Sequence, residues 1–127
     1  MAAPDFTPAD LQLLQDLAFV AAGGAFVADA DAIAAGLAQL RPGSAGPDIA
    51  RALARLNAGR ADEAVACLQA PAGEPAAADG HEQALRQSFL GLALQLAGRQ
   101  AESRRVLEAV AAHPAAGVAR AMLGQAG

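Results

Sequence analysis

The tripeptide Ala-Gly-Arg occurs twice in this chain of 127 residues, at 58–60 and again 39 residues later at 97–99. Each copy lies between two stretches whose apolar residues have helical spacing, so each glycine is predicted to reverse the chain between two helices. A turn that recurs in this way is typical of helical hairpins that cover one another's apolar faces. The repeated turn therefore constrains the fold more than any other feature of the sequence.

Capping residues and prolines set the expected helix boundaries. The first helix is predicted to follow the N-cap Thr7, with Pro8 at its first position and Asp10 completing a capping box, and to run to Ala22. Residues 70–80 contain two Pro and two Gly without a bulky apolar side chain, and are expected to form a loop. The other expected helices are a second from near 29 or 31 to 41, and further ones over 47–58, around 64–68, from the cap at 79 to 97, over 100–112 and around 118–123.

The chain is predicted to be all-α, because no window shows the alternation of apolar and polar residues that marks a strand. The expected architecture is one domain, residues 1–127, in which three antiparallel helical hairpins stack as a short superhelix with a C-terminal capping helix. In the first hairpin only Gly23 or Gly24 can be aligned with the later turn glycines, and about five extra residues then precede the second helix.

Composition and charge exclude several classes of function. The net charge of −4, with nine Arg and no Lys, argues against sequence-independent nucleic-acid binding, which needs a dense basic face. No apolar run approaches the ~20 residues of a membrane span, so no membrane insertion is expected. The start of the sequence does not resemble a secretory leader, and the single Cys67 fits a reducing compartment. A cytoplasmic location is therefore expected.

Residues that could carry chemistry are few. His81 lacks a second His four residues on, which a helical zinc motif would need, and His113 precedes a proline at an expected helix end. Cys67 lies beside Leu68 on the apolar side of its predicted helix, where a cysteine acts as a small hydrophobe. No catalytic residue, metal site or cofactor is predicted, and the protein is not expected to be an enzyme.

The last helix pair resembles a tetratricopeptide repeat. Leu90-Gly91 matches the Leu-Gly of that family, Ala93 the small position that follows, and Gly98 the turn glycine. The middle pair matches through Ala52, Gly59, Ala64 and Leu68, with Arg51 in place of the usual leucine. The resemblance implies a superhelix whose concave side is lined by the first helix of each pair.

Carried over residue by residue, the tetratricopeptide register predicts a partner-binding groove without charge. Such a groove suits an apolar helix better than an acidic tail, which needs basic residues. The alternative is that its leucines are simply core. The predicted groove residues are Leu13, Leu17 and Val20 in the first pair, Ile49, Leu53, Leu56 and Asn57 in the second, and Leu85, Ser88, Leu92, Gln95 and Leu96 in the third.

Two further motifs are similar to those of tetratricopeptide-like chaperones of bacterial type III secretion, especially the chaperone of the needle subunit. They are "LAQLRPGS" at 37–44 and "LNAGRADEA" at 56–64. This resemblance implies a non-catalytic cytoplasmic chaperone that holds the amphipathic helix of a self-polymerising secretion subunit, often with a small helical co-chaperone. The alternatives are a generic tetratricopeptide adaptor, a self-associating subunit of the same apparatus, and a small helical enzyme.

Overall fold

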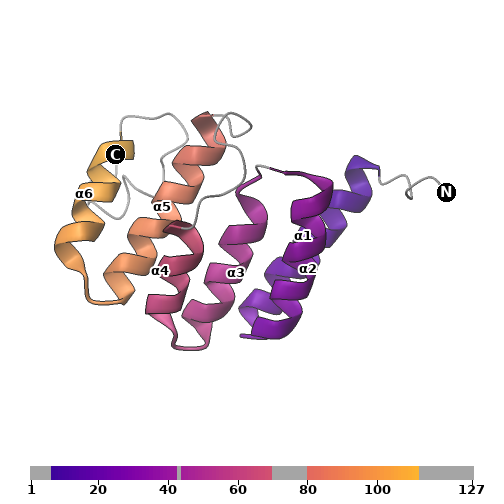
Figure 1. The fold of residues 1–127 in the computed structure, drawn as a ribbon, viewed down its shortest axis with the longest axis horizontal. Coiled ribbons are helices and arrows are strands. Elements are labelled where there is room, and N and C mark those ends of the chain that lie inside the picture. The colour runs from indigo at the N-terminus through magenta and orange to yellow at the C-terminus, as the bar shows by residue number, and fades with distance from the viewer. Residues whose placement is uncertain (1–6, 43, 70–79, 112–127) are drawn as a thin grey trace.

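The computed structural model describes residues 7–42, 44–69 and 80–111, which contain six α-helices and no strand. Figure 1 shows the helices in a row, with α1 and α2 at one end and α6 at the other. The prediction of an all-α protein is confirmed for these residues. The helices are α1 (Pro8–Gly23), α2 (Val27–Leu40), α3 (Gly46–Asn57), α4 (Ala61–Gln69), α5 (Gly80–Leu96) and α6 (Gln100–Val110).

The start of α1 follows the predicted capping box. The Asp10 N–H donates to the Thr7 hydroxyl and the Thr7 N–H donates to the Asp10 carboxylate, both at 3.1 Å. The start of α2 differs from the prediction, because the helix begins at Val27 and its N-cap Phe26 has no side-chain hydrogen bond. The predicted C-terminal helix around 118–123, the residues 70–79 of the predicted loop, and His113 lie outside the described residues.

Three turns between helices share one backbone conformation. Ala25, Gly59 and Gly98 have positive φ angles of 60°, 77° and 82°. In each turn the next residue's N–H reaches back five positions, which satisfies a carbonyl at the end of the preceding helix, as in a Schellman motif. The bonded pairs are Phe26 N and Ala21 O (2.9 Å), Arg60 N and Arg55 O (2.7 Å), and Arg99 N and Leu94 O (2.9 Å).

This equivalence corrects the alignment of the first turn. The residue that matches Gly59 is Ala25, 34 residues earlier, and neither Gly23 nor Gly24 has a positive φ. The extra residues expected before α2 are absent, since α2 begins two residues after Ala25, as α4 begins two residues after Gly59. The turn was missed because alanine rarely adopts a left-handed conformation, which costs about 1–2 kcal/mol.

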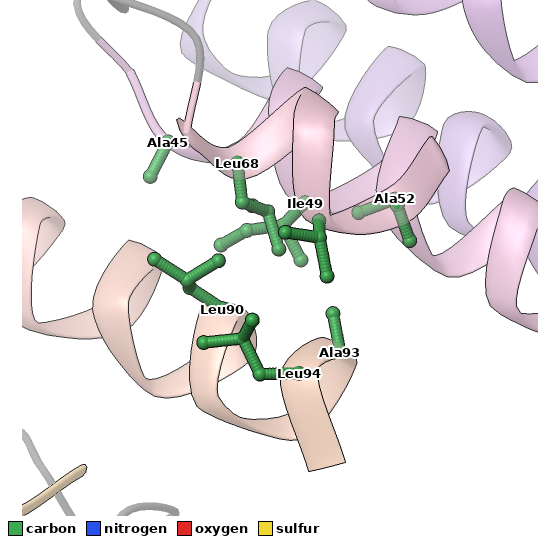
Figure 2. Packing of buried hydrophobic residues seen from close by; sticks show 9 residues of the cluster. Ala45, Ile49, Ala52, Leu68, Leu90, Ala93 and Leu94 are labelled. Atoms are coloured by element: carbon green, nitrogen blue, oxygen red, sulfur yellow. The ribbon is translucent and has the colours of Figure 1, made fainter. Parts of the chain in front are cut away.

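Large apolar side chains form the core between α3, α4 and α5 (Figure 2). Ile49 from α3, Val65 and Leu68 from α4, and Leu90 and Leu94 from α5 are each at least 95% buried. Each fully buried Leu or Ile contributes about 1.5–3 kcal/mol. This cluster therefore carries a large part of the stability of the described chain.

The fully buried side chains where α1 and α2 meet α3 are alanines and one leucine, with partly buried leucine, isoleucine and valine side chains packed around them. Ala21 and Ala22 of α1 and Ala30 of α2 pack against Ala54 of α3. A second small cluster joins Ala18, Leu37 and Ala50. Small side chains let helices approach closely but remove little apolar area from water.

Candidate partner-binding surfaces

Two of the predicted groove residues lie in the core. Ile49 is 1% exposed and belongs to the cluster of α3, α4 and α5. Ser88, the equivalent residue 39 positions later, is fully buried, and its hydroxyl donates to the Ala84 carbonyl (2.8 Å). The prediction that these two residues line an open surface is therefore wrong, because helical spacing does not distinguish a groove-facing side chain from one packed inside.

The other predicted residues on α3 and α5 divide into packed and exposed. Leu53, Leu56 and Leu85 are half-buried against the core cluster. Part of each side chain therefore belongs to the core, as the alternative prediction had it. Leu92 is also half-buried, whereas Asn57, Gln95 and Leu96 are exposed. The Asn57 side chain donates to the Ala22 carbonyl of α1 (2.8 Å) and so helps to join α1 to α3.

The three predicted α1 residues are exposed, but they occupy different helix positions from the predicted groove residues of α3 and α5. Leu13, Leu17 and Val20 are 59%, 46% and 71% exposed. With Ala25 equivalent to Gly59, Leu13 corresponds to Pro47 and Val20 to Ala54, which are not groove positions of α3. The three α1 residues therefore do not occupy the helix positions that correspond to the predicted groove residues of α3.

An open groove of about 410 Å³ lies between α1 and α2. Its charged lining residue is Asp29, and the remaining lining side chains are apolar. These are Leu17, Val20, Ala21, Phe26, Ala32 and Ile33. We call this site the α1–α2 groove. Phe26, which is 61% exposed, is an apolar lining residue that was not predicted to bind a partner.

The surroundings of the α1–α2 groove are acidic. Residues 1–40 contain five Asp and no Arg, Lys or His. Of the Asp residues on α1 and α2, Asp31 is bound by arginines of α3, whereas Asp10, Asp16 and Asp29 are exposed and take part in none of the ion pairs among the described residues. An apolar groove with an acidic edge results.

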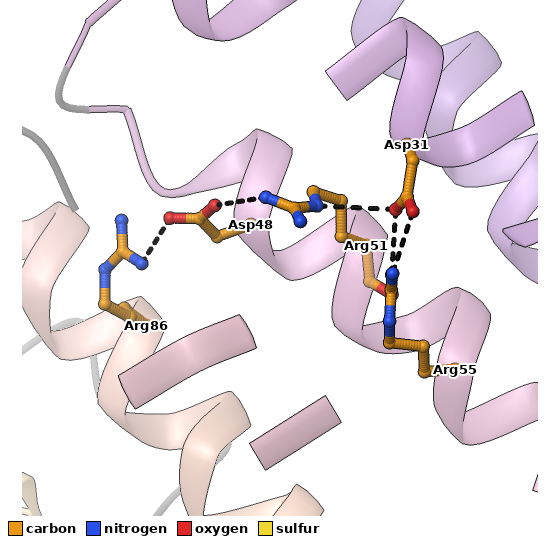
Figure 3. A network of polar contacts seen from close by, with 5 residues as sticks. All are labelled: Asp31, Asp48, Arg51, Arg55 and Arg86. Atoms are coloured by element: carbon orange, nitrogen blue, oxygen red, sulfur yellow. Dashed lines mark hydrogen bonds and ion pairs between the residues drawn. The ribbon is translucent and has the colours of Figure 1, made fainter. Parts of the chain in front are cut away.

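A polar network joins α2, α3 and α5 (Figure 3). Arg55 donates two hydrogen bonds of 2.8 Å to the two carboxylate oxygens of Asp31, and Arg51 donates a third at 3.3 Å. The Arg55 hydrogen bonds lower the pKa of Asp31, and the same bonds raise the pKa of Arg55. Buried Arg86 of α5 bonds to Asp48 of α3 at 2.6 Å.

The network includes the arginine at position 51 and constrains the start of α5. Arg51, which replaces the leucine that the tetratricopeptide resemblance implies, pairs with Asp31 and Asp48. Glu82, which the sequence placed in a capping box with Asp79, accepts a hydrogen bond from the Ala45 N–H (2.6 Å). Asp79 lies outside the described residues. These long-range bonds fix α5 against α3 and leave the α1–α2 groove untouched.

The described residues that could react or bind a metal are few. Cys67 is half-buried, and burial raises the pKa of its thiol, which keeps the sulfur protonated and weakly nucleophilic at neutral pH. Within the residues that the structure describes, no group of three or more His, Cys, Asp or Glu is placed to hold a metal ion. In the same part of the chain, no helix has the length and apolarity that a bilayer crossing requires.

The residues of the α1–α2 groove that were not predicted from the sequence lie close to the Ala25 turn along the chain. Phe26 directly follows the Ala25 turn, and Ile33 and Asp29 lie on the α2 face that borders Leu17 and Val20. Once Ala25 is recognised as a turn residue, these positions follow from helical spacing. Comparison with models of protein families, with curated proteins and with solved structures gives no match to this chain.

Proposed function

We propose that this protein is a non-catalytic, tetratricopeptide-like protein that binds an amphipathic helix of another protein. The observation that carries the proposal is the set of large apolar side chains left exposed on α1 and at the start of α2. Leu13, Leu17, Val20 and Phe26 are each at least 46% exposed, in a chain whose α1 and α2 bury mainly alanine. An exposed apolar patch with a polar edge is typical of a protein-interaction site.

The arrangement of the helices supports the tetratricopeptide-like part of the proposal. The interval of 34 residues between Ala25 and Gly59 equals the length of that repeat. In addition, α3 contacts both α1 and α2, and α5 contacts both α3 and α4, as expected if each hairpin packs on the one before it. The proposed architecture is a short superhelix of three hairpins.

The narrower proposal is a cytoplasmic chaperone of a type III secretion needle subunit, assisted by a small helical co-chaperone. It rests on the resemblance at 37–44 and 56–64. The physical reason is that an apolar helix which drives polymerisation stays soluble only while its apolar face is covered. The alternative is a generic tetratricopeptide adaptor, which would use the same surface for another client.

The test is capture of the native client by matched leucine variants. Leu17→Glu places a charge in the α1–α2 groove, whereas Leu40→Glu places it at a leucine of similar exposure, 39% against 46%, that does not line the groove. We expect Leu17→Glu to lose the client and Leu40→Glu to retain it, with circular dichroism showing both folded. Facing an apolar partner, an unpaired charge costs several kcal/mol, which lowers affinity by orders of magnitude.

A third variant separates the two candidate surfaces. Leu96, at the end of α5, is 60% exposed, so Leu96→Glu leaves the core intact. Loss of the client with Leu96→Glu but not with Leu17→Glu would place binding on α3 and α5. Retention by both variants would contradict the proposed helix-binding function at these surfaces. Mass spectrometry of the captured client then separates a secretion subunit from the client of a generic adaptor.

A further inference from the structure

The exposed face of α1 is equivalent to a face that is covered in the other two hairpins. Leu13 and Val20 correspond to Pro47 and Ala54 of α3, which are buried, and 39 residues further on to Arg86 and Ala93 of α5, which are also buried. In α3, Ala54 packs against alanines of α1 and α2, and in α5, Ala93 belongs to the cluster of α3, α4 and α5. Among the described helices, this face is thus packed against other helices in α3 and α5, whereas in α1 its large apolar side chains are exposed.

The geometry points to a partner helix that packs in the α1–α2 groove, extends the row of helices beyond α1, and carries basic residues beside an apolar stripe. This inference rests on the proposed helix-binding function and specifies the chemistry of the partner at that surface. A helix is the expected occupant because the equivalent face of α3 contacts helices α1 and α2.

The apolar stripe follows from the residues that replace the polar network. At the covered face of α3, Arg51 and Arg55 bind Asp31 of α2. The equivalent residues of α1, 34 positions earlier, are Leu17 and Ala21, and both line the groove. If the partner helix carried a carboxylate at the point that Asp31 occupies relative to α3, that carboxylate would contact apolar side chains of α1. It would lose its hydration without gaining a hydrogen bond or an ion pair. The partner helix must therefore present an apolar side chain at that point.

The basic residues follow from the acidic edge. Asp29 lines the groove, and its equivalent in α4, Glu63, has arginines within 4 Å, at Arg55 and Arg60. No basic residue of the first 40 can play this part for Asp29 or for Asp16. A second copy of the chain docking through the same face would bring these carboxylates against like charges, which disfavours a symmetric dimer. A partner with Lys or Arg beside its apolar stripe has the complementary charge.

The test uses the full chain and two synthetic helical peptides. Both carry one Trp and Leu at helical spacing, and they differ only in having Lys or Glu beside the apolar stripe. The chain itself has no Trp or Tyr, so Trp fluorescence reports on the peptide alone. We expect the Lys peptide to bind about tenfold or more tightly than the Glu peptide at low salt, with the difference shrinking as salt is added.

Variants of the chain locate the site. Leu17→Glu is expected to weaken binding of the Lys peptide by more than about tenfold, while the matched Leu40→Glu leaves it unchanged. Replacing both Asp16 and Asp29 by Asn is expected to remove most of the preference for Lys over Glu. Circular dichroism of each variant confirms that it is folded.

Each contrary result has a distinct meaning. Equal binding of the two peptides, still lost in Leu17→Glu, would overturn the basic partner and leave the proposed function standing. Binding that persists in Leu17→Glu would overturn the location. A dimer of the chain that Leu17→Glu dissociates in analytical ultracentrifugation would make a second copy the occupant and overturn the inference. Absence of binding by both peptides up to about 1 mM would overturn it too, whereas the proposed function itself fails only if the client-capture variants retain the client.

Discussion

The two ends of the described chain place their large apolar side chains differently. Between α3, α4 and α5, residues such as Ile49, Leu68 and Leu94 lie inside, whereas α1 and α2 bury alanines and direct Leu17 and Val20 outward. An alanine interface brings helices close together but gives little burial energy. The comparison indicates that the α3–α5 region contributes most of the burial energy, while the α1–α2 end leaves large apolar side chains exposed, which the proposed function assigns to a partner.

The largest expected effect contrasts one leucine from each region. Leu94→Ala should lower the free energy of unfolding by about 2–5 kcal/mol, because it leaves a cavity in the α3–α5 core. Leu17→Ala should change it by less than about 0.5 kcal/mol, since that side chain is 46% exposed. Urea denaturation followed by circular dichroism measures both values. Similar losses for the two variants would show that the α1–α2 end is as important to stability as the core.

The next contrast concerns the three equivalent turns. Gly59→Ala should destabilise the protein by about 1–2 kcal/mol, because it forces a Cβ into the left-handed conformation. Ala25→Gly should stabilise it by up to about 1 kcal/mol, since it removes the same strain at a cost in the entropy of the unfolded chain. Thermal melts of both variants test this pair. A destabilised Ala25→Gly variant would contradict the equivalence of the turns.

The smallest expected change in stability concerns the ion pair between Asp31 of α2 and Arg55 of α3. Asp31→Asn should lower stability at pH 7 by about 1 kcal/mol, because it removes a partly exposed ion pair with Arg55. Arg55 lowers the folded-state pKa of Asp31 below the unfolded value of about 3.9, so this contribution is complete above that value. As the pH falls through the lower, folded-state pKa, the contribution is lost.

The pH dependence supplies the control for that prediction. The difference in unfolding free energy between the wild type and Asp31→Asn should stay constant from pH 7 to about pH 5 and shrink as the pH falls further. Urea melts across this range measure it. A difference that does not shrink at low pH would mean that the substituted amide disrupts packing and that the charge of Asp31 contributes little.

Local signals in the sequence predicted most of the helices, and long-range packing accounts for what they missed. The capping box of Thr7 and the glycines at 59 and 98 set boundaries that the structure confirms to within a few residues. The first turn was missed because its residue with a positive φ is Ala25, and an alanine does not predict a positive φ. Because of that error, Leu13, Leu17 and Val20 were predicted to line the same groove as residues of α3 and α5. The turn at Ala25 matches them to other positions of α3, and their role in partner binding stays a prediction.

The errors in the predicted groove have a similar physical origin. Ile49 and Ser88 occupy helical positions that could face either a groove or a core, and only the packing of α4 and α5 on α3 decides between them. The ion pairs of Asp31 with Arg51 and of Asp48 with Arg86 join different helices, so no short-range spacing reveals them. The sequence therefore predicted the elements better than the surfaces between them.

The alanine interface beneath α1 and α2 has a consequence for how the protein moves. Proteins open in cooperative units, and the unit with the least buried apolar contact opens at the lowest free energy. Because Ala25 is strained and Ala21, Ala22 and Ala30 bury little area, α1 and α2 should exchange their amide hydrogens through a partial opening that leaves α3, α4 and α5 closed. A helix bound in the α1–α2 groove would suppress that opening, so occupancy should appear as slower exchange in α1 and α2 well before any change is seen in α5.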